Sequence, residues 1–155
     1  RLVYLDIPCG VEGYHTDKTI VYYFGDINKD PNRDLILAAH EHCLMLERFA
    51  ASMLKPGVVV EDIYNETMKH FDERFAGGFM NGGKFLGHSI GLTMDESPAV
   101  ANRFKQVLTE NMTFALEPKI ALPGIGMVGS ENTYLVTPQG GKALTGSPHK
   151  LHCIF

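Results

Sequence analysis

Two glutamates lie in a stretch whose other residues are those of buried β-strands. Residues 114 to 132 read FALEPKIALPGIGMVGSEN and hold Glu117 and Glu131 among apolar and glycine neighbours. Burying an ionised carboxylate without a partner costs several kcal/mol. A strand core that holds two of them must therefore also contain a source of positive charge.

Two aspartates and one histidine are further candidates for the same chemistry. Asp17 follows Asp6 by eleven residues, and a hairpin between them could bring both side chains to one spot. The alternative interpretation is that both simply hydrogen-bond the backbone, as aspartates beside turns usually do. His88 lies in GHSIG between Gly87 and Gly91, where glycine permits close approach of the backbone to a ligand. Taken alone, a single histidine of this kind more often has a structural role.

Together, the four carboxylates and the imidazole form a set typical of metal binding. Two divalent cations would cancel the charge of the carboxylates, whereas a single cation would leave about half of it uncompensated. An oxygen-rich set with one nitrogen suits manganese, cobalt, iron or zinc, and it is too oxygen-rich for a structural zinc site. We therefore expect a site for two divalent metal ions.

The elements that must position these residues follow the order strands, helices, strands. Apolar residues at helical spacing predict one helix from Asp30-Pro31 to Pro56-Gly57 and a second over about 60 to 75. Strands are predicted at 2–7, 20–24, 85–93, 112–121 and 126–136. This order indicates an α+β fold rather than alternating βαβ units.

Composition limits the classes of function. The 155 residues suffice for one ordinary domain, and a net charge of −4 gives no basic footprint for nucleic acid. GFMNGGKF (78–85) lacks the hydroxyl residue of a phosphate-binding loop.

No apolar run approaches the roughly 18 to 20 residues of a membrane span, and three widely spaced cysteines favour a reducing compartment. We expect a cytoplasmic protein that does not bind membranes, and its abrupt start suggests that an N-terminal portion precedes it.

Four segments together resemble a known family. LDIPCGVEGYHTD, GHSIGLTMDESP, ENMTFALEPKIALPG and GSENTYLVT look like the metallopeptidases of the creatinase, methionine aminopeptidase, aminopeptidase P and prolidase superfamily. The resemblance covers nearly the whole chain and is closest to the prolidase-like branch. It implies the α+β "pita-bread" fold, with residues 1–155 forming the C-terminal part of a single catalytic domain. The family's five metal ligands would be Asp6, Asp17, His88, Glu117 and Glu131.

The resemblance also implies roles for these residues. Asp17 and Glu131 would bridge two metal ions, Asp6 would hold one ion, and His88 with Glu117 would hold the other. Glu117 would also carry a proton from water to the leaving nitrogen, so Glu117 and His88 are the expected catalytic residues. The reaction would be hydrolysis of the first peptide bond of a short peptide, with an X-Pro bond favoured. Relatives are commonly homodimers.

Substrate contacts are where the sequence departs from the family. Asp95 stands where the family usually has a histidine that touches the scissile carbonyl, and an ionised aspartate cannot donate a hydrogen bond there. His15 would be a pocket or supporting residue, with an ordinary core or surface role as the alternative. Gly129-Ser130-Glu131-Asn132 lacks the arginine of the R-x-E-D pattern, and Asp17-Lys18-Thr19-Ile20 departs from D-x-T-R.

Two other functions are consistent with this sequence. One is a different hydrolase or a lyase on the same fold, since fold and metal set do not fix the substrate. The other is a catalytically silent pita-bread module that binds protein or nucleic acid. Such modules tend to lose ligands and gain basic patches, whereas this chain keeps all five residues and is net acidic.

Overall fold

The computed structural model describes residues 1–146 and 150–154. The helices are α1 (Arg33–Ser52), α2 (Val60–Met68) and α3 (Met80–Gly83), with 3-10 turns η1 (Ile27–Lys29) and η2 (Glu73–Gly78). The strands are β1 (Leu2–Asp6), β2 (Cys9–Val11), β3 (Tyr14–Thr16), β4 (Thr19–Phe24), β5 (Phe85–Ser89), β6 (Glu96–Ala101), β7 (Thr113–Leu116), β8 (Lys119–Leu122), β9 (Gly126–Gly129), β10 (Asn132–Thr137), β11 (Gly140–Ala143) and β12 (His152–Ile154). The α+β class is confirmed.

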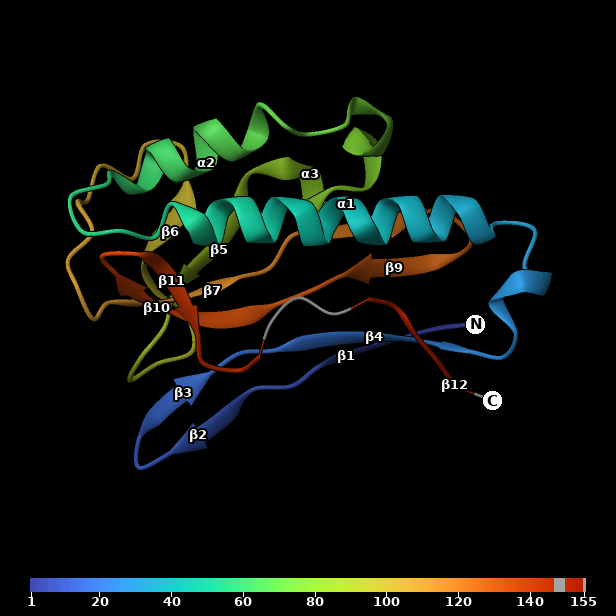
Figure 1. Cartoon of the computed structure of the whole chain (residues 1–155), viewed down its shortest axis with the longest axis horizontal. Helices are drawn as coiled ribbons and strands as arrows, with labels where there is room; N and C mark the ends of the chain where they lie inside the picture. Colours follow the sequence, from blue (N-terminus) through green and yellow to red (C-terminus); the bar gives the residue numbers. More distant parts are fainter. Residues whose placement is uncertain (147–149, 155) are drawn as a thin grey trace.

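The strands of the C-terminal half lie between a helical layer and the N-terminal hairpin of β1 and β4 (Figure 1). Helix α1 crosses the strands of the C-terminal half and contacts β7, β8, β9 and β11. Helix α2 packs on α1 and on β6. On the opposite side lies the hairpin of β1 and β4, and the β2–β3 ribbon extends from it. The two halves of the sequence thus meet along one face of the sheet.

The predicted N-terminal hairpin is confirmed. Strands β1 and β4 pair antiparallel over five residues, from Leu2 opposite Tyr23 to Asp6 opposite Thr19. The turn region between them forms the antiparallel pair β2–β3, and β12 adds to the far edge of β4 in parallel. Because β1 ends at Asp6 and β4 begins at Thr19, the hairpin places Asp6 and Asp17 at the same end.

The predicted strands at 112–121 and 126–136 are each broken in two. The first becomes β7 and β8 because Pro118 has no N–H to continue the ladder, and the second becomes β9 and β10. Strands β7 and β10 join an antiparallel sheet of order β11-β10-β7-β5-β6, whereas β8 and β9 pair as a separate ribbon. Glu117 and Glu131 lie at the two breaks, where the chain passes from one sheet to the other.

Both predicted helices are shorter than expected. Helix α1 begins at Arg33, because Asp30 accepts hydrogen bonds from the Asn32 N–H and the Tyr23 hydroxyl instead of capping the helix, and it ends at Ser52. Helix α2 ends at Met68, and a turn and η2 replace its predicted last part. There the Asp72 N–H donates to His42 Nε2 rather than to a carbonyl one helical turn earlier.

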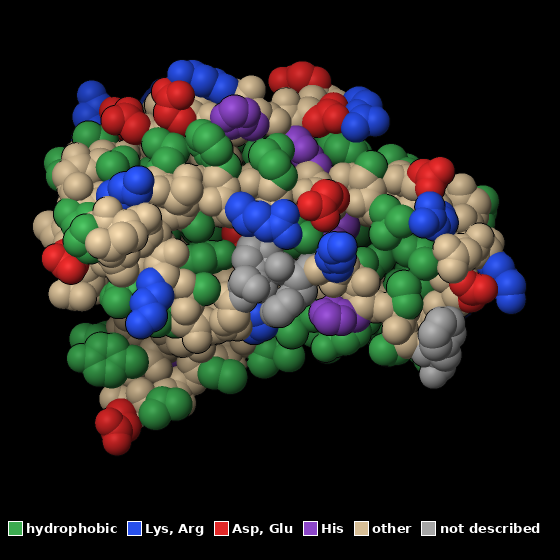
Figure 2. Space-filling view, in the orientation of Figure 1, with side chains coloured by type: hydrophobic (Ala, Val, Ile, Leu, Met, Phe, Trp, Pro, Cys, Tyr) green, Lys and Arg blue, Asp and Glu red, His purple; other side chains and the backbone are tan. Residues whose placement is uncertain are grey.

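The core lies between α1 and the strands. Ile36, Leu46 and Ala50 of α1 belong to one buried cluster with Phe114 and Ile120. Cys9, Cys43 and Cys153 are free thiols. On the face in Figure 2, acidic and basic side chains are interspersed over the helices. No helix in the described part of the chain is long and apolar enough to cross a membrane.

Candidate metal centre

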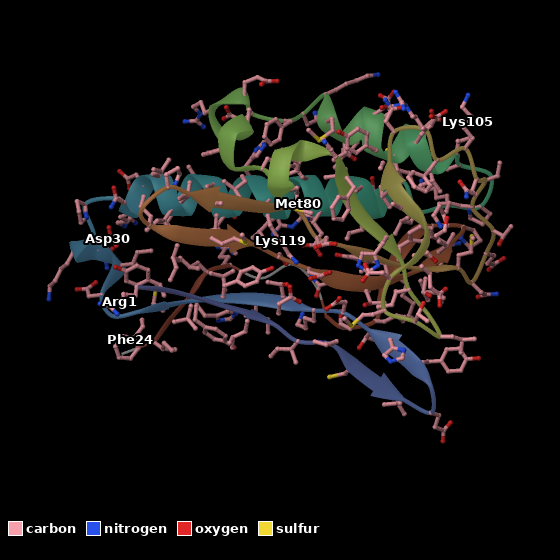
Figure 3. The ribbon with its side chains drawn as sticks, turned by 180° about the vertical axis from the view of Figure 1, so that it is seen from behind. Arg1, Phe24, Asp30, Met80, Lys105 and Lys119 are labelled. Carbon is pink, nitrogen blue, oxygen red and sulfur yellow. The ribbon has the colours of Figure 1, made fainter. Side chains whose placement is uncertain are left out.

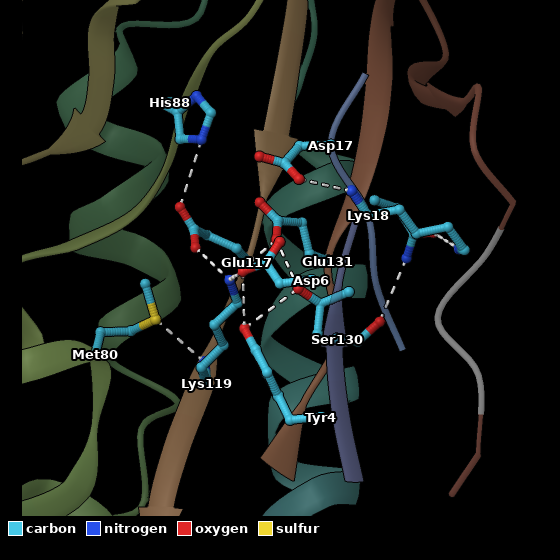
Figure 4. A network of polar contacts seen from close by, with 12 residues as sticks. Tyr4, Asp6, Asp17, Lys18, Met80, His88, Glu117, Lys119, Ser130 and Glu131 are labelled. Carbon is cyan, nitrogen blue, oxygen red and sulfur yellow. Dashed lines mark hydrogen bonds and ion pairs between the residues drawn. The ribbon is translucent and has the colours of Figure 1, made fainter. Parts of the chain in front are cut away.

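The five residues predicted as ligands come from five separate segments. Asp6 ends β1, Asp17 lies between β3 and β4, His88 lies in β5, Glu117 follows β7 and Glu131 precedes β10. Figure 4 shows their side chains directed toward a common region between the hairpin and the sheet. The structure therefore brings together residues that are up to 125 positions apart in the sequence.

Three of the five form a compact group that fits a metal ion. Asp17, His88 and Glu131 are buried, and each offers a ligand atom within 4.8 Å of the other two. Divalent ions such as zinc bind nitrogen and oxygen at about 2.0–2.2 Å. Small side-chain movements would therefore bring the three ligand atoms within binding distance of one ion. Two carboxylates and one imidazole are a suitable donor set for such an ion.

Hydrogen bonding orients the His88 ring. Nδ1 lies 3.0 Å from the carbonyl oxygen of Ser89, and because a carbonyl only accepts, Nδ1 carries the proton. The other nitrogen, Nε2, faces the site and lies 3.5 Å from both Glu117 Oε1 and Asp95 Oδ1. A histidine held by a hydrogen bond from one nitrogen presents the other as a metal ligand.

Gly87 lets the strand before His88 approach its neighbour closely. A Cβ at this position would lie 2.0 Å from the carbonyl oxygen of Ala115 in β7. The backbone pairing of Gly87 with Leu116 and of His88 with Ala115 needs this approach. Glycine at this position therefore sets the distance between His88 and the residues that follow β7.

Lys119 is the charged residue that the sequence interpretation missed. Its Nζ lies 2.7 Å from Glu117 Oε2, 3.0 Å from Glu131 Oε2 and 3.2 Å from Asp6 Oδ2 (Figure 4). Seen from behind, it lies near the middle of the molecule (Figure 3). Side chains two apart in an extended segment share a face, so its spacing from Glu117 was the available signal. The charge balance predicted from the sequence, with two divalent cations against four carboxylates, did not include this ammonium.

Burial and mutual repulsion alter the acidity of the group. Burial, with the charges of Glu131 and Asp6, raises the pKa of Asp17 to about 6. Burial and Glu117 also raise the pKa of Glu131. Burial by itself lowers the pKa of Lys119, but Glu117 and Glu131 raise that pKa by more. The centre thus favours binding of cations by its carboxylates.

A second layer of hydrogen bonds fixes the segment around Glu131. The Thr19 hydroxyl donates to Glu131 Oε2 at 2.8 Å. Asn132 donates from Nδ2 to Glu47 Oε1 of α1 at 2.6 Å, and its own Oδ1 accepts from Lys18 Nζ at 2.6 Å. Asn132 therefore links the site to α1, at the position where the family pattern has an aspartate.

The two residues predicted to bind substrate lie in different surroundings. Asp95 is 82% exposed and reaches His88 from the loop after β5. His15 instead contacts the Gly91 carbonyl, through its backbone N–H at 2.8 Å and its Nδ1 at 3.3 Å. This contact holds the β2–β3 ribbon against that loop. A substrate role for either residue stays a prediction.

A cavity of about 290 Å³ opens beside the carboxylates. Asp6, Glu117 and Lys119 line its polar side. Met80, Phe85 and Met127 line its apolar side. A small molecule with one polar and one apolar part fits such a lining.

Comparisons with known proteins agree on one family. The family model described as "Metallopeptidase family M24" matches residues 1–138. The chain is 30% identical to "Xaa-Pro dipeptidase" of Pyrococcus horikoshii over 150 residues, which are 97% of this chain and 41% of that protein. It is 32% identical to "Putative dipeptidase YkvY" of Bacillus subtilis over 149 residues, 96% of this chain and 39% of that protein.

Solved structures agree with the sequence comparison. The X-Pro aminopeptidase from Thermotoga maritima MSB8 matches with a TM-score of 0.84 and 27% identity, over 99% of this chain and 41% of that chain. The prolidase from Pyrococcus horikoshii OT3 matches with a TM-score of 0.80 and 29% identity, over 97% of this chain and 41% of that chain. The chain thus spans about two-fifths of the length of these relatives.

Proposed function

Because this chain belongs to metallopeptidase family M24, we propose that it carries the metal centre of an exopeptidase. The enzyme hydrolyses the N-terminal peptide bond of short peptides and prefers X-Pro bonds. Its fold is the pita-bread α+β fold of the family. The observation that carries the proposal is the convergence of Asp17, His88 and Glu131 within 4.8 Å of one another. That residues 1–155 are the C-terminal part of a single domain is part of the same proposal.

The chain's own residues suit a divalent ion. Asp17, His88 and Glu131 would hold it, with Asp6 and Glu117 as the further predicted ligands. When bound, such an ion supplies Lewis-acid activation of water at neutral pH. The donor set suits manganese, cobalt, iron or zinc. The expectation of two ions stays a prediction, since its charge argument omitted Lys119.

Glu117 is placed to move the proton that hydrolysis requires. Its Oε1 faces His88 at 3.5 Å, and its Oε2 accepts from Lys119 at 2.7 Å. Oε1 would accept a proton from the attacking water as the new C–O bond forms. It would then deliver that proton to the peptide nitrogen as the C–N bond breaks.

The substrate proposal draws on the cavity and on the relatives. The apolar side of the cavity, with Met80, Phe85 and Met127, offers a surface for a proline ring beside the carboxylates. Relatives that match nearly all of this chain are named Xaa-Pro dipeptidase. The proposal for the protein as a whole is a homodimer that acts on short peptides in the cytoplasm.

One assay tests the proposed reaction. The full protein, loaded with manganese or cobalt, should release proline from X-Pro dipeptides and leave peptides without proline largely uncut. Absence of turnover in protein shown by elemental analysis to contain metal would reject the peptidase. The exposed Asp95 beside His88 would then favour another hydrolase or a lyase.

Glu117→Ala is the matched variant for the proton-transfer role. Turnover should fall by at least about 100-fold, the lower range for general acid–base catalysis, while the circular dichroism spectrum is retained. Glu110→Ala, an exposed carboxylate in the loop before β7, is the control and should keep full activity. Wild-type turnover in Glu117→Ala would refute the assigned role.

A further inference from the structure

Lys119 occupies a place prepared for its side chain. It opens β8 immediately after Pro118, and its side chain is only 11% exposed. Gly129 of the partner strand β9 leaves room for its stem, because a Cβ there would lie 2.8 Å from Lys119 Cα and 3.1 Å from its Cγ. The Tyr4 ring centroid lies 5.5 Å from Nζ. The ammonium is therefore enclosed rather than solvated.

The hydrogen-bonding capacity of this ammonium is fully used. A lysine ammonium has three N–H donors, and Asp6, Glu117 and Glu131 each accept from Nζ. No N–H is left over for a substrate carboxylate or for a developing oxyanion. Lys119 thus acts toward the centre as a fixed positive charge.

The oxygens bound to Lys119 are also largely used. Glu131 Oε2 accepts from both Lys119 and the Thr19 hydroxyl. Asp6 Oδ2 accepts from both Lys119 and the Tyr4 hydroxyl. A divalent ion on this side would have to displace these donors from the lone pairs it needs.

The charge balance is compatible with the same conclusion. With the ammonium counted, one divalent ion leaves the four carboxylates and Lys119 at a net charge of about −1 and two ions would leave them at about +1, so neutralising the carboxylates no longer requires a second ion. An ion bound near Asp6 would also lie close to the like charge of the Lys119 ammonium, which repels it. Of Asp17, His88 and Glu131, only Glu131 makes a contact with Lys119 in the described part of the chain, and it does so through Oε2.

We propose that the ammonium of Lys119 takes the place of a second divalent ion, so that this centre holds one ion, at Asp17, His88 and Glu131. The inference rests on the metal site of the proposed function. It makes Asp6 a partner of Lys119 instead of a metal ligand. It also makes Lys119 a positioning residue, which fixes the orientation of Glu117 through Oε2.

Metal stoichiometry tests the inference directly. The full protein is stripped with a chelator, titrated with Mn²⁺ in a calorimeter, and measured by elemental analysis after dialysis. Wild type should hold one ion per chain, with the paramagnetic resonance spectrum of an isolated Mn²⁺. Lys119→Ala frees the three carboxylates and should rise from one ion to two, with the spectrum of a coupled pair. Lys105→Ala, an exposed lysine, should stay at one.

Each outcome has a distinct meaning. Two ions in wild type would overturn the inference while leaving the proposed peptidase intact. One ion in both wild type and Lys119→Ala would also overturn it, because the ammonium would not be what excludes the second ion. No bound ion in wild type would instead reject the metal site of the proposed function. If Lys119→Ala fails to fold, Lys119→Met, which keeps the length of the side chain, supplies the same comparison.

Discussion

Glu47 is a buried acid whose ionisation should destabilise the fold. It lies on α1 with 0% exposure, and its Oε1 accepts from Asn132 at 2.6 Å and from the Tyr134 hydroxyl at 2.8 Å. Its Oε2 has no hydrogen-bond partner in the described part of the chain. Burial outweighs these hydrogen bonds and raises the pKa of Glu47 to about 7.

The sign and size of the effect follow from this shift. The pKa of Glu47 in the folded chain lies above its usual 4.5, so its contribution to stability is complete below pH 4.5 and is lost as pH rises through about 7. At about 1.4 kcal/mol per pKa unit, the loss is about 3 kcal/mol. Glu47→Gln keeps the shape and the Oε1 acceptor but cannot ionise. Its free energy of unfolding should exceed that of wild type by about 3 kcal/mol near pH 8, and by less than about 1 near pH 5.

Urea unfolding of the metal-free full protein at the two pH values measures this difference. Asp17 and Glu131 are present in both proteins, so the difference between variant and wild type reports on Glu47. Glu41→Gln changes an exposed residue of the same helix, paired with Arg48 at the surface, and should alter stability by no more than about 0.5 kcal/mol at either pH. An equal difference in the free energy of unfolding between Glu47→Gln and wild type at both pH values would show that ionisation of Glu47 does not destabilise the fold.

Two further changes test the metal centre and its frame. Asp17→Asn should weaken Mn²⁺ binding at least about 10-fold in calorimetry, because it removes a charged ligand while keeping the side-chain shape; unchanged affinity would place the ion elsewhere. Gly87→Ala should destabilise the fold by about 3 kcal/mol in the same urea assay, because its Cβ would meet the Ala115 carbonyl oxygen at 2.0 Å. Gly77→Ala, with no atom within 4 Å of the new Cβ, should be close to neutral, and equal effects of the two would contradict the close-approach argument.

Local pattern was enough to predict the hairpin and the long helix. Strands β1 and β4 are rich in β-branched and aromatic residues, and α1 has apolar residues at helical spacing, so short-range preferences and tertiary packing agree there. Pattern failed at β6, whose sequence ESPAVA holds a proline and two polar residues and was not predicted as a strand. It is a strand because β5 and α2 supply its pairing and its packing.

The sequence by itself determined the chemical types at the site. The apolar neighbours of Glu117 and Glu131 predicted a source of positive charge, because apolar strands cannot hold lone charges, and Asp6, Asp17 and His88 completed the predicted metal-binding set. Tertiary structure alone decided how that charge is balanced. In the sequence, Lys119 looks like an ordinary lysine of a strand and Glu47 like an ordinary glutamate of a helix, because lysine and glutamate side chains are usually exposed to solvent. Only the tertiary contacts, of Lys119 with Asp6 and of Glu47 with Asn132, turn one into a buried cation and the other into a buried acid.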